Sequence, residues 1–262
     1  MSDCVLFSEI ETRCGRVIAR ATLNAPKALN ALSLEMIQAL SQQMDQWEQR
    51  DDVVAIWLDG AGGKAFCAGG DIVQMHKSMV KHAGQGRNPF TEQYFAEEYA
   101  MDYRLHTSRI PVVAFGDGIV MGGGVGVSFH GSHRIAGPNI GFAMPEVGIG
   151  FFPDVGGSYL LSRLPGNLGV YLGLTGGRVK QADAVTSGLA THACDDLDAL
   201  EQALCSSGNA EDTVAKHSIE VSKGPHLENL KAINACFGAG SVADIVTRLE
   251  KFSDYENENK VW

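Results

Sequence analysis

The chain has 262 residues, 45% of them apolar, and a net charge of −10. This length and composition fit one large globular domain and argue against a disordered chain. The acidic charge disfavours nucleic acid or an anionic membrane as the main partner, and no uninterrupted apolar run is long enough to cross a bilayer. Six scattered cysteines without a C-x-x-C pair predict reduced thiols rather than a zinc site or disulfides, and therefore a cytoplasmic protein.

The first fifty residues predict a hairpin followed by a helix. Residues 5–11 and 16–23 are short alternating runs separated by a turn, as in a pair of antiparallel strands. Ser33 is placed to cap a helix. The apolar face of that helix has three- and four-residue spacing and consists of Ile37, Leu40, Met44 and Trp47.

A first glycine-rich junction follows a buried strand. Residues 53–58 form a continuous apolar run, which predicts that strand, and the chain then passes through residues 62–72, GGKAFCAGGDI. Residues 84–90 read as a loop. We expect Thr91 to cap the next helix, which runs towards Ser108 and carries Glu98.

A second junction of the same kind follows a strand predicted at residues 112–115. It leads into Gly122, Gly123 and Gly124 and then into an apolar run at 125–129, which predicts a helix with a glycine first turn. The N–H groups of such a turn have no partner within the helix and lie at its positive end. A negatively charging oxygen could therefore bind there.

Two carboxylates, Glu146 and Asp154, lie in the glycine-rich loop that follows. After them, helices are expected at 158–164, 169–174 and 181–187, and the tail alternates helical patterns with breakers at 197–205, 211–222, 227–237 and 242–252. The sequence shows no linker and no second domain with a composition of its own.

Several common site motifs are missing from the sequence. The glycine triplet does not fit G-x-G-x-x-G, Gly62-Gly63-Lys64-Ala65 lacks the hydroxyl residue of a P-loop, and no G-x-S-x-G occurs. His130 and His133 are best interpreted as packing residues. The candidate chemistry therefore depends on the two junctions and the carboxylates.

Three motifs in this order resemble the crotonase superfamily of acyl-CoA enzymes and, within it, the 3-hydroxyisobutyryl-CoA hydrolases. They are GKAFCAGGDI at 63–72, MGGGVG at 121–126 and MPEVGIGFFPDVGG at 144–157. The resemblance implies an α/β fold, a spiral of repeated ββα units with a helical C-terminal region. It divides the chain into a core at 1–195 and a helical segment at 196–262 that is short compared with the family.

The resemblance also implies which residues act. The thioester oxygen would lie between the amides of Gly70 and Gly123, which suits the charge that develops there during acyl transfer. Hydratases of the superfamily carry a glutamate where this chain has Gly126, so simple hydration is disfavoured. Glu146 would attack the thioester or activate water, Asp154 would hold the substrate hydroxyl and the second reactant, and Glu98 would close the acyl pocket.

Simpler interpretations of the same residues stay open at this point. Glu98 could be a solvated charge on an exposed helix, and Asp154 could be a helix N-cap. Phe151 and Phe152 are expected in a pocket wall or in the core. Glu146, among apolar neighbours, would be costly to bury without a task.

Hydrolysis of a short branched 3-hydroxyacyl-CoA, as in valine breakdown, is the leading expectation. The alternatives are an enoyl-CoA hydratase or isomerase that uses Glu146 alone, and a non-catalytic acyl-CoA binding module. The resemblance implies no cofactor and no metal, because coenzyme A is part of the substrate. A homo-oligomer is left open.

Overall fold

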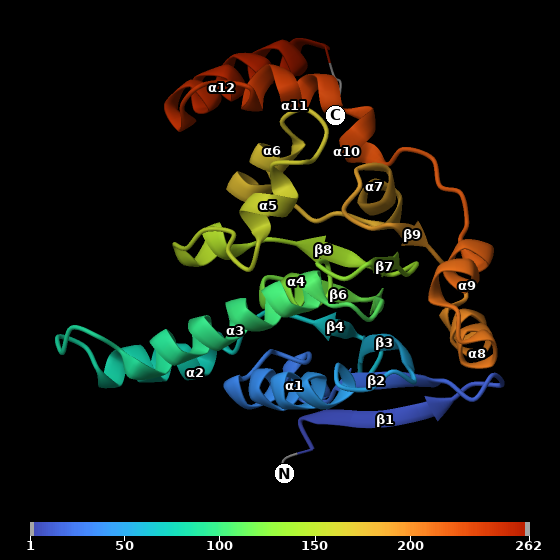
Figure 1. Cartoon of the computed structure of the whole chain (residues 1–262). Helices are drawn as coiled ribbons and strands as arrows, with labels where there is room; N and C mark the ends of the chain where they lie inside the picture. Colours follow the sequence, from blue (N-terminus) through green and yellow to red (C-terminus); the bar gives the residue numbers. More distant parts are fainter. Residues whose placement is uncertain (1–2, 260–262) are drawn as a thin grey trace.

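The computed structural model describes the backbone of residues 3–259 and the side chains of residues 3–252. The chain advances from the hairpin at one end of the molecule to the last helices at the other (Figure 1). Its strands are β1 (Val5–Glu11), β2 (Val17–Leu23), β3 (Val53–Gly60), β4 (Ala65–Cys67), β5 (Val112–Gly116), β6 (Ile119–Met121), β7 (His133–Ala136), β8 (Gly141–Ala143) and β9 (His192–Ala193).

Helices cover both sheets and fill the C-terminal end. The α-helices are α1 (Leu34–Trp47), α2 (Ile72–Lys81), α3 (Pro89–Thr107), α4 (Gly123–Gly126), α5 (Gly157–Leu161), α6 (Leu168–Thr175), α7 (Gln181–Thr186), α8 (Leu197–Ser207), α9 (Ala210–His217), α10 (Pro225–Glu228), α11 (Leu230–Phe237) and α12 (Val242–Asn259). Two 3-10 turns, η1 (Pro26–Ala28) and η2 (Glu146–Ile149), complete the elements. Within residues 3–259, none of the helices combines the length and apolar character that a bilayer crossing needs.

The strands form two sheets, and from β3 onward successive strands alternate between them. The larger sheet has the order β1-β2-β3-β5-β7-β9, and the smaller has the order β4-β6-β8. Only β1 and β2 pair antiparallel; every other pair is parallel. Each turn of the chain (β3-β4, β5-β6, β7-β8) therefore adds one strand to each sheet, which confirms the expected spiral of ββα units.

The N-terminal predictions agree with the structure. The hairpin pairs Val5 with Leu23, and the hydroxyl of Ser33 accepts a hydrogen bond from the N–H of Met36 at the start of α1. The predicted apolar face of α1 is buried, together with Met36. Burying this stripe against the sheet stabilises the helix more than its intrinsic propensity does.

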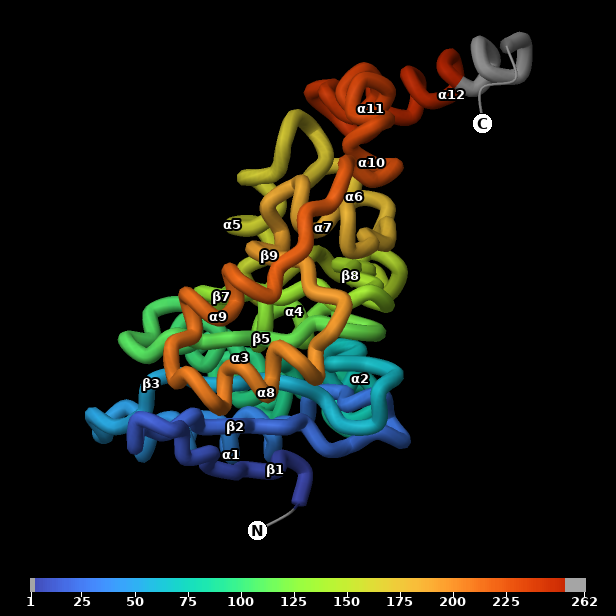
Figure 2. Tube along the Cα trace, turned by 90° about the vertical axis from the view of Figure 1, so that its right-hand side faces the viewer, coloured from blue at the N-terminus to red at the C-terminus, as the bar shows by residue number. Residues whose placement is uncertain are grey.

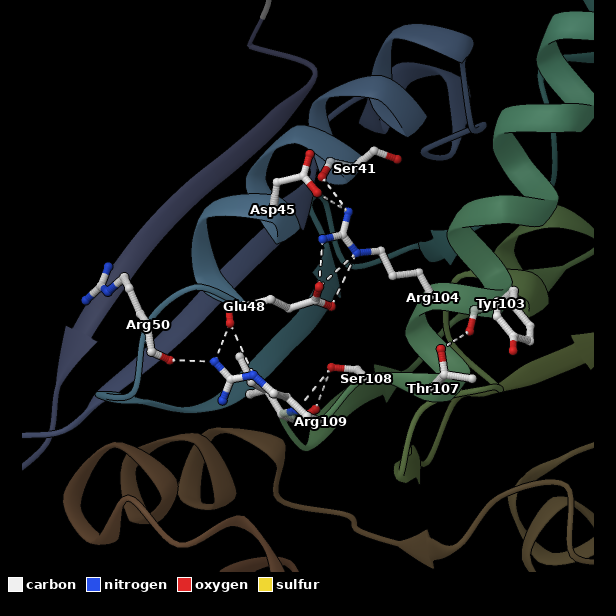
Figure 3. Close-up of polar contacts among 10 residues, drawn as sticks. Ser41, Asp45, Glu48, Arg50, Tyr103, Arg104, Thr107, Ser108 and Arg109 are labelled. Carbon is white, nitrogen blue, oxygen red and sulfur yellow. Dashed lines mark hydrogen bonds and ion pairs between the residues drawn. The ribbon is translucent and has the colours of Figure 1, made fainter.

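Helix α3 begins differently from the prediction and is fastened to α1. Its N-cap is Asn88, not Thr91, because the Asn88 side chain accepts from the N–H groups that open the helix. Near its other end Arg104 donates to Glu48 at 2.7 Å and pairs with Asp45 at 2.8 Å, and it also donates to the Ser41 carbonyl (Figure 3). A planar guanidinium that contacts three groups at once fixes the position of α3 against α1.

Two hydrophobic clusters hold the layers together. The larger contains α1 and α3 and continues through α6 to Ile233 and Phe237 of α11. In the smaller cluster, Leu200 of α8 and Val214 of α9 pack on the opposite face of the larger sheet, against Trp57. In Figure 2 these two helices lie beside the β-sheet, whereas α10 to α12 lie at the far end. The division of the chain at residue 195 stays a prediction.

Two of the C-terminal helices differ from the sequence prediction. The helix expected at 211–222 ends at His217, and the one expected at 227–237 is divided between α10 and α11 at Asn229. Asp183 of α7 explains the start of α10: its buried carboxylate accepts from the N–H groups of His226 and Leu227, each at 3.0 Å. A carboxylate from outside α10 therefore serves as its cap.

Candidate functional site

The carboxyl ends of β4, β6 and β8 bring the candidate residues to one edge of the smaller sheet. Cys67 of β4 pairs with Val120 of β6, and Val120 pairs with Phe142 of β8. Gly70 and Gly123 each lie three residues beyond the first of these pairs, and Glu146 lies four residues beyond Phe142. Parallel strands commonly place a ligand at this edge, so two separate junctions and one loop meet there.

The amides of Gly70 and Gly123 lie close together and have no backbone acceptor within residues 3–259. A Cβ atom added at Gly123 would lie only 3.2 Å from the Gly70 nitrogen. Helix α4 begins at Gly123, in agreement with the predicted glycine first turn, but it ends at Gly126 and not near Phe129. The Gly123 N–H therefore lies in the first turn, where an oxygen that gains negative charge is stabilised.

The Glu146 side chain lies beside the same turn and is 8% exposed. A Cβ added at Gly122 would lie 3.0 Å from its Oε1 atom, and neither carboxylate oxygen has a hydrogen-bond partner in the described part of the chain. Burial raises the pKa of Glu146 to about 7, and the charge of Asp154 adds to the rise. Such a carboxyl group exchanges its proton near neutral pH.

Glu98 is not the solvated charge that its helix pattern allowed, because it is only 2% exposed. Its Oε1 would lie 2.5 Å from a Cβ added at Gly123, so the carboxyl group faces the first turn of α4. The Tyr94 hydroxyl is 3.3 Å from the same oxygen and donates to the Leu32 carbonyl at 2.8 Å. Burial, followed by the charges of Asp154 and Glu146, raises the pKa of Glu98 to about 8.

Asp154 is held from α3 by Tyr99, whose hydroxyl donates to Oδ2 at 2.6 Å. Burial raises the pKa of Asp154, and the Tyr99 hydrogen bond partly offsets this rise. Asp154 is not a helix N-cap, because α5 begins at Gly157 with Gly156 as its cap residue and no side-chain cap bond. Instead Val155 takes a positive φ of 41°, which is rare for a β-branched residue.

His130 stabilises this turn, in agreement with its predicted packing role. Its Nε2 lies 2.7 Å from the Val155 carbonyl oxygen, and burial lowers the pKa of the ring. A neutral imidazole therefore donates to the strained residue next to Asp154. The packing leaves no room for a side chain at Gly156, where an added Cβ would collide with the His130 ring.

Asp102 was missed by the sequence reasoning, although it lies one helical turn after Glu98 on the same face of α3. It is 5% exposed. The available signal was the row of polar side chains Tyr94, Glu98 and Asp102 at four-residue spacing beside apolar Met101 and Leu105. Polar side chains that repeat along a buried helix face need hydrogen-bond partners there, and such a row indicates a binding or catalytic site.

The aromatic pair after Glu146 does not lie in the core. Phe152 is 62% exposed and stacks on Phe151 with ring centroids 4.4 Å apart. Phe151 also stacks on Phe95 of α3, at 5.9 Å. A core position is therefore wrong for both rings, because Phe151 is exposed as well, and a place in a pocket wall stays a prediction. Among the side chains of residues 3–252, no group of three His, Cys, Asp or Glu residues is arranged so that it could hold a metal ion.

The fold and the paired glycine junctions are those of the crotonase superfamily. The profile of the family "Enoyl-CoA hydratase/isomerase" matches residues 18–262, and the chain belongs to this family. Among solved structures it is similar to a carnitinyl-CoA dehydratase from Mycobacterium thermoresistibile, with a TM-score of 0.88 and 37% identity, over 96% of this chain and 71% of that one. An enoyl-CoA hydratase from Rhodobacter sphaeroides gives a TM-score of 0.84 at 36% identity, over 94% and 69%.

Curated relatives have a more specific name. The chain is 45% identical over 250 residues to the mitochondrial 3-hydroxyisobutyryl-CoA hydrolase of Mus musculus. The match covers 91% of this chain and 63% of the relative. The human protein of that name is 41% identical over 242 residues, 88% of this chain and 61% of the relative. The chain thus spans slightly less than two thirds of these relatives. Their names do not support the cytoplasmic location expected from the sequence, which stays a prediction.

Proposed function

We propose that the chain hydrolyses an acyl-CoA thioester, with 3-hydroxyisobutyryl-CoA as the preferred substrate and 3-hydroxyisobutyrate and free coenzyme A as products. One observation carries the proposal: the buried Glu146 carboxyl, with both oxygens unpaired in the described structure, lies against the turn that presents the Gly123 amide. The names of the curated relatives support the substrate.

In this proposal the amides of Gly70 and Gly123 donate to the thioester oxygen. Each preorganised donor is worth roughly 10²–10³ in rate, because charge develops on that oxygen when a nucleophile adds. The ionised Glu146 attacks the carbonyl carbon, and the thiolate leaves and takes up a proton. Water then hydrolyses the mixed anhydride. In the alternative route, Glu146 takes a proton from water, which attacks directly.

Asp154 and Glu98 would complete the acyl site. Asp154, held by Tyr99, would hold the substrate hydroxyl and orient water, and Glu98 would close the pocket beside Gly123. Close like charges resist joint ionisation, so we expect the carboxyl groups to share protons near neutral pH. No cofactor or metal is needed for these steps, and an assembly of several copies remains a prediction.

Thiol release from 3-hydroxyisobutyryl-CoA tests the proposal, with wild type and Glu146→Gln measured side by side. We expect thiol release by the wild type and a loss of at least roughly 10³-fold in the variant. Loss of enoyl absorbance from crotonyl-CoA without thiol release would favour the hydratase instead. Binding of both thioesters with no turnover, unchanged by the substitution, would identify a non-catalytic binding module.

If hydrolysis occurs, a single turnover in oxygen-18 water tests for the mixed anhydride. Label recovered in the Glu146 carboxylate means that the anhydride formed and that water opened it at the Glu146 carbon. Label confined to the acyl product fits the base route, and also an anhydride that water opens at its acyl carbon.

A further inference from the structure

Asp102 is the carboxyl group near the site for which the proposed mechanism gives no role. Its side chain is 5% exposed, and neither Oδ1 nor Oδ2 has a hydrogen-bond partner among the described residues. Burying a polar group without a partner costs roughly 1–3 kcal/mol, and an unpaired charge costs more. We therefore expect another interaction of Asp102 to offset the cost of its burial.

The backbone of α4 is shaped around the Asp102 carboxyl. A Cβ added at Gly126 would lie 2.6 Å from Oδ2 and 2.7 Å from Oδ1, so only glycine leaves this space. Glu98 meets Gly123 in the same way one helical turn earlier, at 2.5 Å. Helix α3 packs against α4 (Figure 1). It therefore places two carboxyl groups along α4, Glu98 against its first residue and Asp102 against its last.

The spacing along α4 matches a short acyl chain. Gly123 and Gly126 are three residues apart, roughly 4.5 Å at the helical rise of 1.5 Å per residue. A thioester whose carbonyl oxygen lies at the Gly123 amide would extend a three-carbon chain to about the level of Asp102. The carboxylate oxygens of Glu146 are as inaccessible to solvent as those of Asp102. The burial of Asp102 is therefore compatible with a position in the acyl site.

The protonation state of Asp102 determines what it can bind. Burial, followed by the charges of Glu98 and Asp154, raises the pKa of Asp102 well above its usual range. The shift favours the protonated form, which offers one O–H donor and one carbonyl acceptor. An alcohol needs the same pair, because its oxygen accepts one hydrogen bond and its hydrogen donates another.

We propose that Asp102, and not Asp154, binds the hydroxyl of the acyl chain and so sets the preference for hydroxylated over unsubstituted acyl groups, which leaves Asp154 to orient water. The assignment rests on the proposed thioester hydrolysis and deepens it. Asp102 acts in specificity and needs no proton transfer to the reacting carbon. A site built to hydrogen-bond a hydroxyl group rejects an analogue without it, because its own polar atoms then stay unpaired.

The test compares 3-hydroxyisobutyryl-CoA with isobutyryl-CoA, which lacks the hydroxyl. In Asp102→Leu, which keeps the branched shape, the ratio of kcat/KM for the two substrates should fall by roughly 10²-fold. Asp102→Asn retains a donor and an acceptor and should keep most of the ratio. If kcat/KM falls by the same factor for both substrates, the proposal is overturned. Asp102 would then have a purely structural role, for example in binding an internal water.

A second pair of variants tests the placement without changing Asp102. Gly126→Ala puts a methyl group where the carboxyl lies and should lower the same ratio. Gly240→Ala adds a methyl with no atom within 4 Å and should not. An unchanged ratio in Gly126→Ala would contradict the placement.

Binding measurements separate this proposal from the proposed function. Dissociation constants of both thioesters are measured in Glu146→Gln with and without Asp102→Leu, where turnover is not needed. A preference for the hydroxylated thioester that falls roughly tenfold with Asp102→Leu supports hydroxyl binding even if the wild type releases no thiol. No preference in either protein would overturn it.

Discussion

The Tyr99 hydroxyl and the Asp154 carboxylate join helix α3 to the loop after β8 through a hydrogen bond of 2.6 Å. Tyr99→Phe removes the donor, so the pKa of Asp154 should rise further and the loop should lose its tie to α3. We expect kcat/KM for 3-hydroxyisobutyryl-CoA to fall roughly tenfold, about 1.4 kcal/mol. Tyr103→Phe, on an exposed tyrosine of the same helix, is the control and should leave activity intact.

The acidic limb of the pH profile should report Glu146. Its carboxyl must be ionised to attack or to accept a proton, and its pKa is raised to about 7. We therefore expect kcat/KM to rise with pH up to about 7 and to level off above it. A profile that is flat from pH 5 to 8 would contradict a role for this carboxylate in the rate-limiting step.

The stability of the fold should decrease as pH rises, because of Glu98. Its pKa is raised from 4.5 to about 8, so between these values the folded state holds a proton that the unfolded state has lost. The native state then binds more protons, and the free energy of unfolding falls by up to about 1.4 kcal/mol per pH unit. Glu98→Gln should flatten this slope in urea titrations at pH 5, 6, 7 and 8. An unchanged slope would mean that Glu98 ionises normally.

The Arg104 clamp should control both stability and activity, because α3 carries Glu98 and Tyr99. Arg104→Ala loses its hydrogen bonds to Glu48 and Ser41 and its pairing with Asp45. We expect a loss of about 1–2 kcal/mol in urea unfolding, limited by the partial exposure of the guanidinium, and a lower kcat/KM. Arg87→Ala, at an exposed surface pair, should change neither.

Asp183 should be essential for docking of the C-terminal helices. It is fully buried and accepts from the backbone N–H groups that begin α10, and from Nδ1 of His226 at 2.9 Å. Asp183→Ala leaves these donors unpaired, and we expect a loss of about 3 kcal/mol. Asp198→Ala, on an exposed turn of α8, is the control. Equal losses in both variants would show that the Asp183 contacts add little.

Local patterns in the sequence predicted most of the framework. The buried stripe of α1, the Ser33 cap and the apolar runs of β3 and β5 depend on neighbours a few residues apart, so each could be read directly. The Asn88 cap was missed because Thr91 offered an equally acceptable capping side chain. The start of α10 at Pro225 was missed because it depends on Asp183, which is 43 residues away from His226.

The candidate site was predicted less completely. Gly70, Gly123 and Glu146 stand in recognisable motifs, and the structure brings all three to one edge of a sheet. Asp102 and Tyr99 belong to no motif. The burial of Asp102 against Gly126 and the hydrogen bond from Tyr99 to Asp154 follow from how α3 packs, which is a tertiary arrangement that local spacing does not encode.

The alternation of strands between two sheets has a consequence for how this protein tolerates insertions and deletions. Gly70 lies three residues after Cys67 of β4, and Gly123 lies three residues after its pairing partner Val120 of β6. The pairing register of the two strands therefore fixes the relative positions of the two amides. A single residue added between Cys67 and Gly70 would displace one donor by up to roughly 3.3 Å, more than a hydrogen bond can accommodate. Loop length here should therefore be far less variable than at the 82–88 turn, which carries no such spacing requirement.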